Sequence, residues 1–514
     1  MERRLREPRC GPPSTQVEAA LSAHDSRAAG AGRLRGAREH LGYPLPVPAR
    51  AFRLAVVAVA AALASLPACR ARPPRNVVIV TIDTLRRDRV SAYGYTRPTT
   101  PEVDALGARG VVFEDAWSQA PNTNESLAST LTSRRAPVTT VRGLAERLDP
   151  GVPTIASSAR AAGFRTGAFV SSVVLQARYS GLDAGFDVYD DTQTDPCFGH
   201  ENAQRVAQRT VDAALAWLGQ ADARPFLLWV HLYDPHGPYT PPEPTPELDA
   251  TAPVLPEGAV AATWQGPAHI PKYLRVPGVT EPLAYADAYD REIRYADRHL
   301  GRLFAALDPA TTYVLVHSDH GEAHGEDAYW FRHGALLHDP ALRIPMLLAG
   351  PGIPAGRRVT ARVRNLDVVP TLCALAGLRA PADAEGRDLS DVVTGSRDTA
   401  PGDDWFVAEA HRREATGDDT GIDVRWKLRY VDGARADLVW WPALDRRAVA
   451  RGTGADVVTA MERMRAWLLG PDDPLPDVLP DATEDALRGL GYTAPSETVS
   501  PPSPSPSASP PSRR

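Results

Sequence analysis

The chain has 514 residues, of which 43% are hydrophobic and 23% are charged, and its formal net charge is −6. This length is enough for a large core, and for one big domain or two to three ordinary ones. The small negative charge argues against a nucleic-acid-binding protein, which would need a basic face. The four cysteines, Cys10, Cys69, Cys197 and Cys373, fit no zinc module. At most one internal disulfide, between Cys197 and Cys373, can form in the mature chain.

The N-terminal part has the features of an unstructured extension followed by an export signal. Residues 1–49 are rich in Arg, Ala, Gly and Pro without a sustained period, which indicates disorder or a start codon assigned too early. A basic flank at 50–53 precedes an apolar run at 54–66, which is too short for a typical membrane span and is typical of a secretory signal. The run leads into Pro67-Ala68-Cys69, which with Leu66 resembles a bacterial lipobox, whose Cys becomes the lipidated first residue.

From residues 50–69 we expect an exported protein, periplasmic or at the cell surface, whose only membrane contact is a lipid anchor at Cys69. An ordinary signal peptide or a short anchor is the alternative. Residues 70–75 are then a short tether.

The apolar stretch 76–82 is the first element of the predicted fold, and it ends abruptly in charge at Asp83. A continuous β-branched run of this length is typical of a strand buried on both faces of a parallel sheet. Carboxylates at the C-terminal end of such a strand lie where α/β folds bind their ligands. Asp83 is therefore a candidate for chemistry, and a helix N-cap is the alternative interpretation.

Strands and helices alternate along the next three hundred or so residues, which predicts an α/β fold with a large, mostly parallel central sheet and helices on both faces. Apolar runs predict strands, and longer amphipathic segments predict helices. The expected strands are 77–82, 111–113, 164–171, 226–232 and 312–317. One helix is expected to begin at Pro101, and three more are expected at 203–218, 285–307 and 367–378.

The C-terminal part changes character. We expect the main domain at 76–400 and a small C-terminal subdomain at 401–495, because short β-like runs lie between 403 and 444. A last helical turn or two is expected at 484–492. The Pro/Ser-rich tail 496–514 predicts disorder.

Chemistry-bearing residues follow several of these apolar runs. The first is Asp83, and the second is the loop that holds Thr123 and Ser126. Six of the 13 histidines fall within 231–236 and 317–333, a clustering that scattered solvent-facing histidines would not produce. The loop at Thr123 runs into a helix, so backbone N–H groups at the helix start face its contents and attract anions.

Two carboxylates with one imidazole make a mixed oxygen and nitrogen site that suits one divalent ion such as Ca²⁺, Mg²⁺, Mn²⁺ or Zn²⁺. Asp83, Asp319 and His320 are the predicted ligands. An ion held there could also bind the hydroxyl of Thr123, lower its pKa and make it a nucleophile.

Three further histidines and one serine complete the predicted site. His231, His236 and His333 could neutralise an oxyanion or protonate a leaving group. Ser126 and His231 are predicted substrate contacts. For His231, and for His317, a hydrogen-bonded core residue is an equally weighted alternative.

Taken together, the motifs make the chain similar to the sulfatase branch of the alkaline-phosphatase superfamily over residues 76–493. The resemblance depends on motifs that occur in a set order: Ile82-Asp83-Thr84-Leu85-Arg86-Arg87-Asp88, Tyr93-Gly94-Tyr95, the Thr123 loop, Asp234-Pro235-His236-Gly237-Pro238-Tyr239, Ser318-Asp319-His320-Gly321-Glu322, His333-Gly334, Arg343-Ile344-Pro345, Asp367-Val368-Val369-Pro370-Thr371-Leu372 and Leu487-Arg488-Gly489-Leu490-Gly491-Tyr492.

Carried over position by position, the resemblance implies that Asp83, Asp319 and His320 bind one metal ion, Ca²⁺ by family. It implies that Thr123 stands at the nucleophile position, and it places His236 and His333 at the oxyanion and leaving-group contacts. Thr84 stands where many relatives have a second aspartate.

The nucleophile loop departs from the family pattern. Active sulfatases carry Cys or Ser followed by x-Pro-Ser-Arg, and the first residue is oxidised to formylglycine. Here the window begins with Thr123, ends with Leu127 and keeps only Ser126. We expect no formylglycine, because the carbinol carbon of threonine bears a methyl group and cannot become an aldehyde. Glu125 adds a negative charge that disfavours an anionic ester.

Three functions remain open at this point. The first is hydrolysis of sulfate esters, and the second is phosphodiester hydrolysis or phosphoryl transfer by a metal-bound Thr nucleophile, as the site's similarity to lipoteichoic acid synthase implies. The third is a catalytically degenerate relative that binds an anion or a glycan. The expected substrate is an anionic ester, namely a sulfated or phosphorylated glycan or small molecule. The loop 238–282 and the C-terminal subdomain are expected to shape the entrance.

Overall fold

The computed structural model describes residues 75–451 except 136–138, 140, 142–145, 198–199, 272–273, 335–336, 400–405, 417–418, 433 and 442–445. The predicted export signal with Cys69, the helical turn at 484–492 and the tail 496–514 therefore lie outside the described residues. Within the described residues, no helix is both long enough and apolar enough to cross a membrane.

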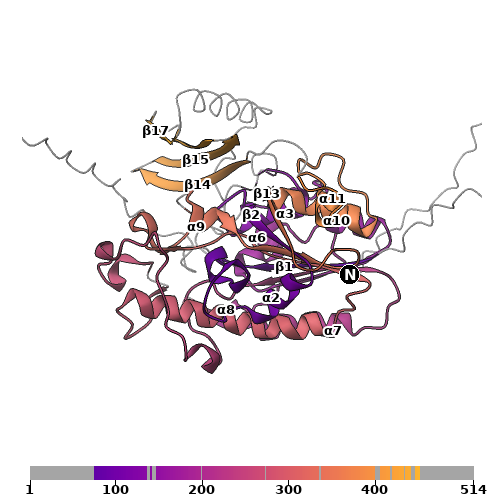
Figure 1. The fold of residues 1–514 in the computed structure, drawn as a ribbon, viewed down its shortest axis with the longest axis horizontal. Coiled ribbons are helices and arrows are strands. Elements are labelled where there is room, and N and C mark those ends of the chain that lie inside the picture. The colour runs from indigo at the N-terminus through magenta and orange to yellow at the C-terminus, as the bar shows by residue number, and fades with distance from the viewer. Residues whose placement is uncertain are drawn as a thin grey trace, which may run out of the picture. The chain divides into compact units, whose positions relative to one another are not determined.

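A nine-stranded sheet forms the centre of the fold (Figure 1). Eight of its strands follow one another in the order β11-β2-β12-β8-β1-β7-β3-β4, and β13 pairs with β2. In that order, the strands span Arg343–Ile344, Val111–Trp117, Met346–Ala349, Thr312–Ser318, Asn76–Ile82, Phe226–Leu232, Arg165–Val170 and Val188–Asp190, and β13 spans Arg357–Arg364.

The sheet is mostly parallel, as the alternation of elements predicts. β1 pairs in parallel with both β7 and β8, and Val80 stands opposite Val230 and Val316. The antiparallel pairs are confined to one side, where β12 joins β8 to β2 and β11 pairs with β2. The longest buried runs of the sequence therefore lie side by side in the middle of the sheet.

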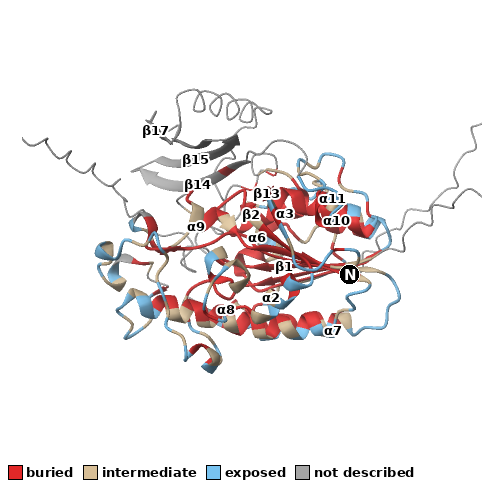
Figure 2. Ribbon diagram, viewed as in Figure 1, coloured by how far each residue is buried: buried red, intermediate tan, exposed pale blue. Residues whose placement is uncertain are grey.

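Helices cover both faces of the sheet (Figure 1). One face is packed by α2 (Pro101–Ala108), α7 (Ala207–Leu218) and α8 (Pro282–Ala305), and the other by α3 (Thr123–Thr132), α5 (Ile155–Ala161), α10 (Val368–Ala376) and α11 (Ser390–Val393). Alternate residues of β1 divide between the two cores: Val77 and Ile79 belong to the core under α3 and α10, whereas Val78 and Val80 belong to the core under α7 and α8. Figure 2 shows the sheet buried between these layers.

Shorter elements complete the described part of the chain. α6 spans Ala177–Ser180 and α9 spans Asp339–Leu342. Two small antiparallel pairs join β5 (Asp195–Cys197) to β6 (His200–Gln204) and β9 (Ala323–His324) to β10 (Trp330–Arg332). A separate four-stranded antiparallel sheet consists of β14 (Phe406–Thr416), β15 (Asp419–Asp432), β16 (Ala434–Trp441) and β17 (Arg446–Arg451).

Several boundaries differ from the sequence-based expectations. β2 continues to Trp117, and α7 begins at Ala207, because the preceding residues form β6. α10 ends at Ala376, where Gly377 takes a left-handed conformation at φ 76°. Cys373 in this helix carries a free, buried thiol, so the disulfide that the sequence allows is not formed.

Candidate active site

The candidate site lies where β1 and β8 end. These strands are parallel neighbours, and Ile82 stands opposite Ser318 at their last paired positions. Asp83 follows the first strand, and Asp319 and His320 follow the second. Carboxyl ends of adjacent parallel strands open at the same edge of the sheet, so residues more than 230 positions apart in the chain meet there.

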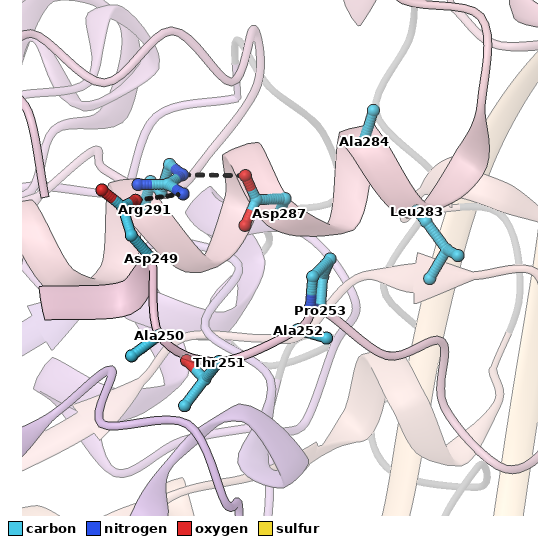
Figure 3. A pocket seen from close by; sticks show the side chains of 9 residues that line it. All are labelled: Asp249, Ala250, Thr251, Ala252, Pro253, Leu283, Ala284, Asp287 and Arg291. Atoms are coloured by element: carbon cyan, nitrogen blue, oxygen red, sulfur yellow. Dashed lines mark hydrogen bonds and ion pairs between the residues drawn. The ribbon is translucent and has the colours of Figure 1, made fainter. Parts of the chain in front are cut away.

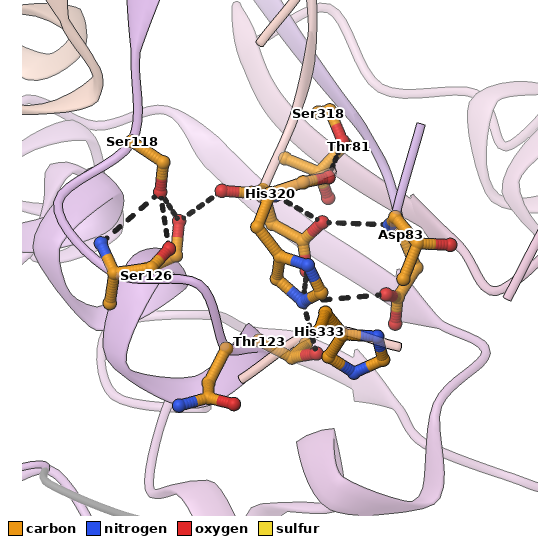
Figure 4. Close-up of polar contacts among 12 residues, drawn as sticks. Thr81, Asp83, Ser118, Thr123, Ser126, Ser318, His320 and His333 are labelled. Atoms are coloured by element: carbon orange, nitrogen blue, oxygen red, sulfur yellow. Dashed lines mark hydrogen bonds and ion pairs between the residues drawn. The ribbon is translucent and has the colours of Figure 1, made fainter. Parts of the chain in front are cut away.

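Asp83, Asp319 and His320 form a compact, fully buried cluster whose ligand atoms all lie within 4.8 Å of one another. His320 Nε2 lies 3.8 Å from Asp83 Oδ1 and 3.6 Å from Asp319 Oδ2. Figure 4 shows Asp83 and His320 together with Thr123 and His333. The three ligands predicted from the sequence therefore converge.

The cluster fits a divalent cation. Both Asp83 carboxylate oxygens and Asp319 Oδ2 are buried and make no hydrogen bond of ordinary geometry within the described residues. His320 Nδ1 donates to the carbonyl of Gly321 at 3.0 Å, so its Nε2 lone pair faces the carboxylates. Burial and the neighbouring Asp319 raise the pKa of Asp83, while His320 and the Thr123 hydroxyl lower it. A cation would compensate the charge of two buried carboxylates whose basic neighbours in the described part of the chain are histidines.

Thr123 is the first residue of α3, and its hydroxyl faces the same cluster. Its Oγ1 lies 3.3 Å from His320 Nε2, and the residue is 5% exposed. The first turn of a helix leaves backbone N–H groups without intrahelical acceptors, which favours anions in front of it. The predicted nucleophile therefore adjoins the predicted ligands, at the anion-attracting end of a helix.

Ser126 lies one turn further along α3 and is fully buried. Its hydroxyl donates to the backbone carbonyl of Asp319 at 2.6 Å, and it accepts from the Ser118 hydroxyl at 2.9 Å. Asn365 Nδ2 donates to the Ser126 carbonyl at 3.0 Å. These contacts hold α3 against the loop that carries Asp319 and His320. The sequence-based prediction of a substrate contact did not include this positioning role.

Thr84, which stands where many relatives have a second aspartate, takes a left-handed conformation at φ 56°. Its backbone N–H donates to Asp319 Oδ1 at 3.2 Å, and its carbonyl accepts from the Tyr289 hydroxyl at 2.7 Å. The backbone of Thr84 therefore orients one carboxylate of the cluster. The motif identified the position, but its conformation has no sequence signal, since a positive φ is unusual for threonine.

His231 adjoins the cluster on the side of Asp83 and Thr81. It is fully buried on β7, its Nδ1 is 2.8 Å from the Thr81 hydroxyl, and its Nε2 is 3.6 Å from Asp83 Oδ2. Burial lowers the pKa of His231 to about 4, so the ring is neutral near pH 7. His317 occupies the matching register position on β8, and its Nδ1 donates to the Ser318 carbonyl at 2.7 Å. This geometry fits the core-residue interpretation of both histidines.

His236 and His333 lie next to each other beside His320. Their ring centroids are 5.1 Å apart, and the ring of His333 is 4.6 Å from that of His320. Burial lowers the pKa of His236 to about 3 and that of His333 to about 4, so both rings are neutral near pH 7 in the protein without ligands. The structure therefore brings both predicted catalytic histidines to the cluster.

Glu322 is the residue that sequence reasoning left without a role. Its Oε1 accepts from His333 Nδ1 at 3.0 Å, and its Oε2 accepts from the Tyr239 hydroxyl at 3.0 Å. Burial raises the pKa of Glu322 to about 7. The position of Glu322 directly after Asp319-His320-Gly321 indicated that it lies near the site. Its hydrogen bond to His333 could not be predicted from the spacing of residues in the sequence.

The departures in the nucleophile loop have distinct structural places. Leu127, at the position of the family's Arg, is fully buried in the core under α3. Glu125 is also buried, and its Oε1 accepts from Asn122 Nδ2 at 3.2 Å. The loop therefore retains a hydroxyl next to the cluster but lacks the usual guanidinium.

A separate open cavity of about 490 Å³ lies between the 249–253 segment and the start of α8 (Figure 3). Its charged lining residues already pair with one another, since Arg291 contacts both Asp249 and Asp287. None of the predicted site residues lines it.

Curated relatives of the chain include several sulfatases. A Δ4,5-hexuronate-2-O-sulfatase of Bacteroides thetaiotaomicron is 24% identical over 361 residues, which cover 64% of this chain and 74% of the relative. Arylsulfatase K of Mus musculus is 24% identical, covering 74% of this chain and 78% of the relative. A choline-sulfatase of Rhizobium meliloti is 35% identical, but over only 24% of this chain and 25% of the relative.

A solved structure with a similar fold is the phosphonate monoester hydrolase of Silicibacter pomeroyi, with a TM-score of 0.59 and 20% identity. The match covers 77% of this chain and 94% of that protein. At this identity the similarity shows the α/β fold alone. The sulfatase family model matches residues 75–378, which include the whole cluster at the ends of β1 and β8. The chain therefore belongs to the sulfatase family, a group of hydrolases within the alkaline-phosphatase superfamily.

Proposed function

We propose that this chain is a divalent-metal-dependent hydrolase of sulfate esters in which Thr123 is the direct nucleophile. The observation that carries the proposal is the place of its hydroxyl, 3.3 Å from His320 Nε2, beside buried carboxylate oxygens that make no hydrogen bond within the described residues. Ca²⁺ is the ion that the family resemblance favours, and Mn²⁺, Mg²⁺ and Zn²⁺ also suit this ligand set.

Each residue has a part in the proposed reaction. A divalent ion held by Asp83, Asp319 and His320 would act as a Lewis acid. It would lower the pKa of the Thr123 hydroxyl and offset negative charge. Thr123 Oγ1 releases its proton to solvent and attacks the central atom of the ester, and the bond from that atom to the alcohol oxygen breaks. The first turn of α3 faces the non-bridging oxygens. His236 contacts an oxyanion, and His333 gives a proton to the departing alcohol.

A second candidate is phosphodiester hydrolysis or phosphoryl transfer at the same site. It is favoured by the identity of Thr123, because threonine cannot form the aldehyde hydrate by which sulfatases release sulfate. A sulfated threonine must be cleaved by a further attack at sulfur, whereas a phosphothreonine can be hydrolysed or passed to an acceptor. The buried Glu125 in the same turn does not separate the two candidates, because a sulfate monoester and a phosphodiester each carry a single negative charge.

The substrate class is proposed from the relatives. The names of similar proteins include a hexuronate-2-O-sulfatase and a choline-sulfatase, and one similar structure contains D-glucosamine-2-N,6-O-disulfate. We propose an anionic ester of a glycan or of a small molecule for this chain. The loop 238–282 is the proposed wall of the entrance.

Export and lipid anchoring are also proposals, supported by the composition of residues 50–69. In a bacterial host, labelling with a radioactive fatty acid should mark the full chain but not its Cys69→Ala variant. Unlabelled full chain would remove the anchor from the proposal.

The deciding experiment offers the purified protein an aryl sulfate, an aryl phosphate and a bis-aryl phosphate, with Ca²⁺, Mn²⁺, Mg²⁺ or Zn²⁺ in turn. Sulfate release that disappears in Thr123→Ala supports the first candidate, and turnover of the diester alone supports the second. If no pairing of ester and ion gives turnover, the result favours the third function, a non-catalytic relative. A Thr123→Ser variant, which keeps the hydroxyl, controls for the packing of the helix start.

A further inference from the structure

Glu322 has a geometry that a merely structural carboxylate does not require. It is 1% exposed, and each of its two oxygens accepts one hydrogen bond at 3.0 Å, from His333 Nδ1 and from the Tyr239 hydroxyl. A buried carboxylate that spans an imidazole and a phenol is held in a single orientation. Its oxygens are therefore committed to two residues of the site motifs.

The surroundings prevent this carboxylate from swinging away. Arg86 donates to the Glu322 backbone carbonyl at 2.6 Å, so the main chain is held separately from the side chain. The ring of Tyr239 packs at 5.3 Å from that of Tyr289 and at 6.0 Å from that of Phe331. Arg86 takes its charge partners elsewhere, from Asp88 and Glu326, and so does not need the Glu322 carboxylate.

The consequence falls on His333. Because Nδ1 is occupied by Glu322, Nε2 is the ring atom left to face the site. The ring lies between His320 and His236, at 4.6 Å and 5.1 Å, and its side chain is 14% exposed. A histidine held in this way presents one defined nitrogen to a ligand, as in triads where a carboxylate orients a catalytic imidazole.

We propose that Glu322 is the positioning residue of the leaving-group acid, acting through His333. The inference rests on the proposed function and deepens it. In the ligand-free protein the ring is neutral with its proton on Nδ1, and Nε2 takes up a second proton from solvent when the anionic ester binds. That proton passes to the bridging oxygen of the ester as the bond from that oxygen to sulfur or phosphorus breaks, and the ring becomes neutral again. Nε2 regains a proton from the water that later attacks the threonine ester, and Glu322 keeps its hydrogen bond to Nδ1 throughout.

The experiment measures kcat for a series of aryl esters whose leaving phenols differ in acidity. A good leaving group needs no proton, whereas a poor one does. For Glu322→Gln we expect a loss of about 100-fold or more with a phenyl ester and a loss below about 3-fold with a dinitrophenyl ester, the difference being what general acid catalysis contributes. His333→Ala should give the same pattern, and the double variant should be no slower than His333→Ala.

A matched control is Glu326→Gln, which neutralises another buried glutamate of the same segment, one that pairs with Arg86 at 2.7 Å. It should lower the melting temperature without steepening the dependence on the leaving group. Bound metal, measured by elemental analysis, should be the same in Glu322→Gln and in the unchanged protein. Equal losses of Glu322→Gln across the whole ester series, or additive losses in the double variant, would overturn the proposal.

A second readout needs no turnover. Long-range ¹H–¹⁵N spectra of the imidazole rings should show His333 protonated at Nδ1 in the unchanged protein, and a ring protonated only at Nε2 would contradict the role given to Glu322. Absence of turnover with every ester rejects the proposed function, and with it the proton transfer to a leaving group. The spectra then still decide whether Glu322 orients His333, so the two failures are told apart.

Discussion

Gly321 shows how a single residue can position this site. It separates His320 from Glu322, and its backbone N–H donates to the Ala341 carbonyl at 2.7 Å. A Cβ added at this position would lie 2.0 Å from the Pro340 carbonyl oxygen, which is backbone and cannot rotate aside. The loop that carries the ligands can therefore approach α9 this closely only with glycine.

Gly321→Ala should destabilise the protein by about 1–3 kcal/mol, because the added methyl forces two backbone segments apart. It should also lower metal binding, since His320 moves with the loop. Urea unfolding and a metal titration test both effects. Gly219→Ala is the control, because its Cβ would meet only ordinary contacts, 3.4 Å or more away. Equal stability of the two variants would show that the loop has room to adjust.

At the scale of elements, helix α3 carries two buried serines that differ in their hydrogen bonds. Ser126 donates to the carbonyl of Asp319 at 2.6 Å. Ser129 is equally buried, but its hydroxyl has no hydrogen-bond partner within the described residues. The same helix therefore provides a matched pair of buried hydroxyls. One is bonded to the loop that carries Asp319 and His320, and the other is not.

Ser126→Ala should cost about 1–3 kcal/mol of unfolding free energy, because it leaves buried partners of the hydroxyl unsatisfied. Ser129→Ala should be neutral or slightly stabilising, since it removes a polar group that lacks a partner. Denaturant unfolding of both variants measures the difference. Similar values for the two would mean that the bond from Ser126 to Asp319 does not hold the helix.

The junction of β7 with α8 holds two buried carboxyl groups in contact. Asp234 and Glu292 share a hydrogen bond, and burial is the largest cause that raises both pKa values, that of Asp234 to about 6. An acid whose pKa is higher in the folded state favours folding below its ordinary pKa. That contribution is lost as the pH rises through the folded-state value. The pair therefore destabilises the protein above about pH 6.

Glu292→Gln should raise the unfolding free energy at pH 8 by about 1–3 kcal/mol, because one pKa unit corresponds to about 1.4 kcal/mol and only one carboxylate then remains to ionise. At pH 4 the change should be small. Chemical unfolding of the variant and the unchanged protein from pH 4 to pH 8 gives the difference directly. If the difference in unfolding free energy between the two proteins does not grow with pH, the hydrogen bond between Asp234 and Glu292 does not have the proposed effect.

At the scale of the whole molecule, the cation site should contribute to stability. Asp83 and Asp319 are neighbouring buried carboxyl groups, and a bound ion would offset their negative charge. A ligand present at a hundred times its dissociation constant stabilises the folded state by about 2.7 kcal/mol. Adding Ca²⁺ or Mn²⁺ after a chelator should therefore raise the melting temperature.

Asp319→Ala is the matching variant for this prediction. Its melting temperature should not respond to either ion, because one of the three ligands is gone. Elemental analysis of the purified proteins checks the same point. An identical thermal response in both proteins would place ion binding elsewhere.

Much of this arrangement was predictable because it follows from long hydrophobic runs. Each buried run of seven residues specifies a strand, and parallel connections bring the ends of those strands to one edge. That is why Asp83, Asp319 and His320 could be grouped without a structure. The antiparallel side of the sheet was not predicted, since β11 and β12 span only two and four residues.

The parts of the site that the sequence did not predict depend on tertiary contacts, which leave no periodic pattern in the sequence. The pairing of Glu322 with His333 requires the chain to return through β9 and β10, and nothing in the intervening residues specifies that path. The left-handed Thr84 and the inward bonds of Ser126 are likewise set by neighbours distant along the chain. Sequence patterns therefore identify which segments carry the chemistry, whereas their mutual orientation comes from packing.

The place of β1 in the middle of the sheet has a consequence for synthesis. This strand is made first, but its partners β7 and β8 begin 150 and 236 positions later. The apolar stretch 76–82 therefore gains its neighbour on one edge only after residue 232, and on the other edge only after residue 318, has left the ribosome. Chains that terminate before residue 319 lack two of the three residues of the candidate cation cluster, so added cations should not stabilise them.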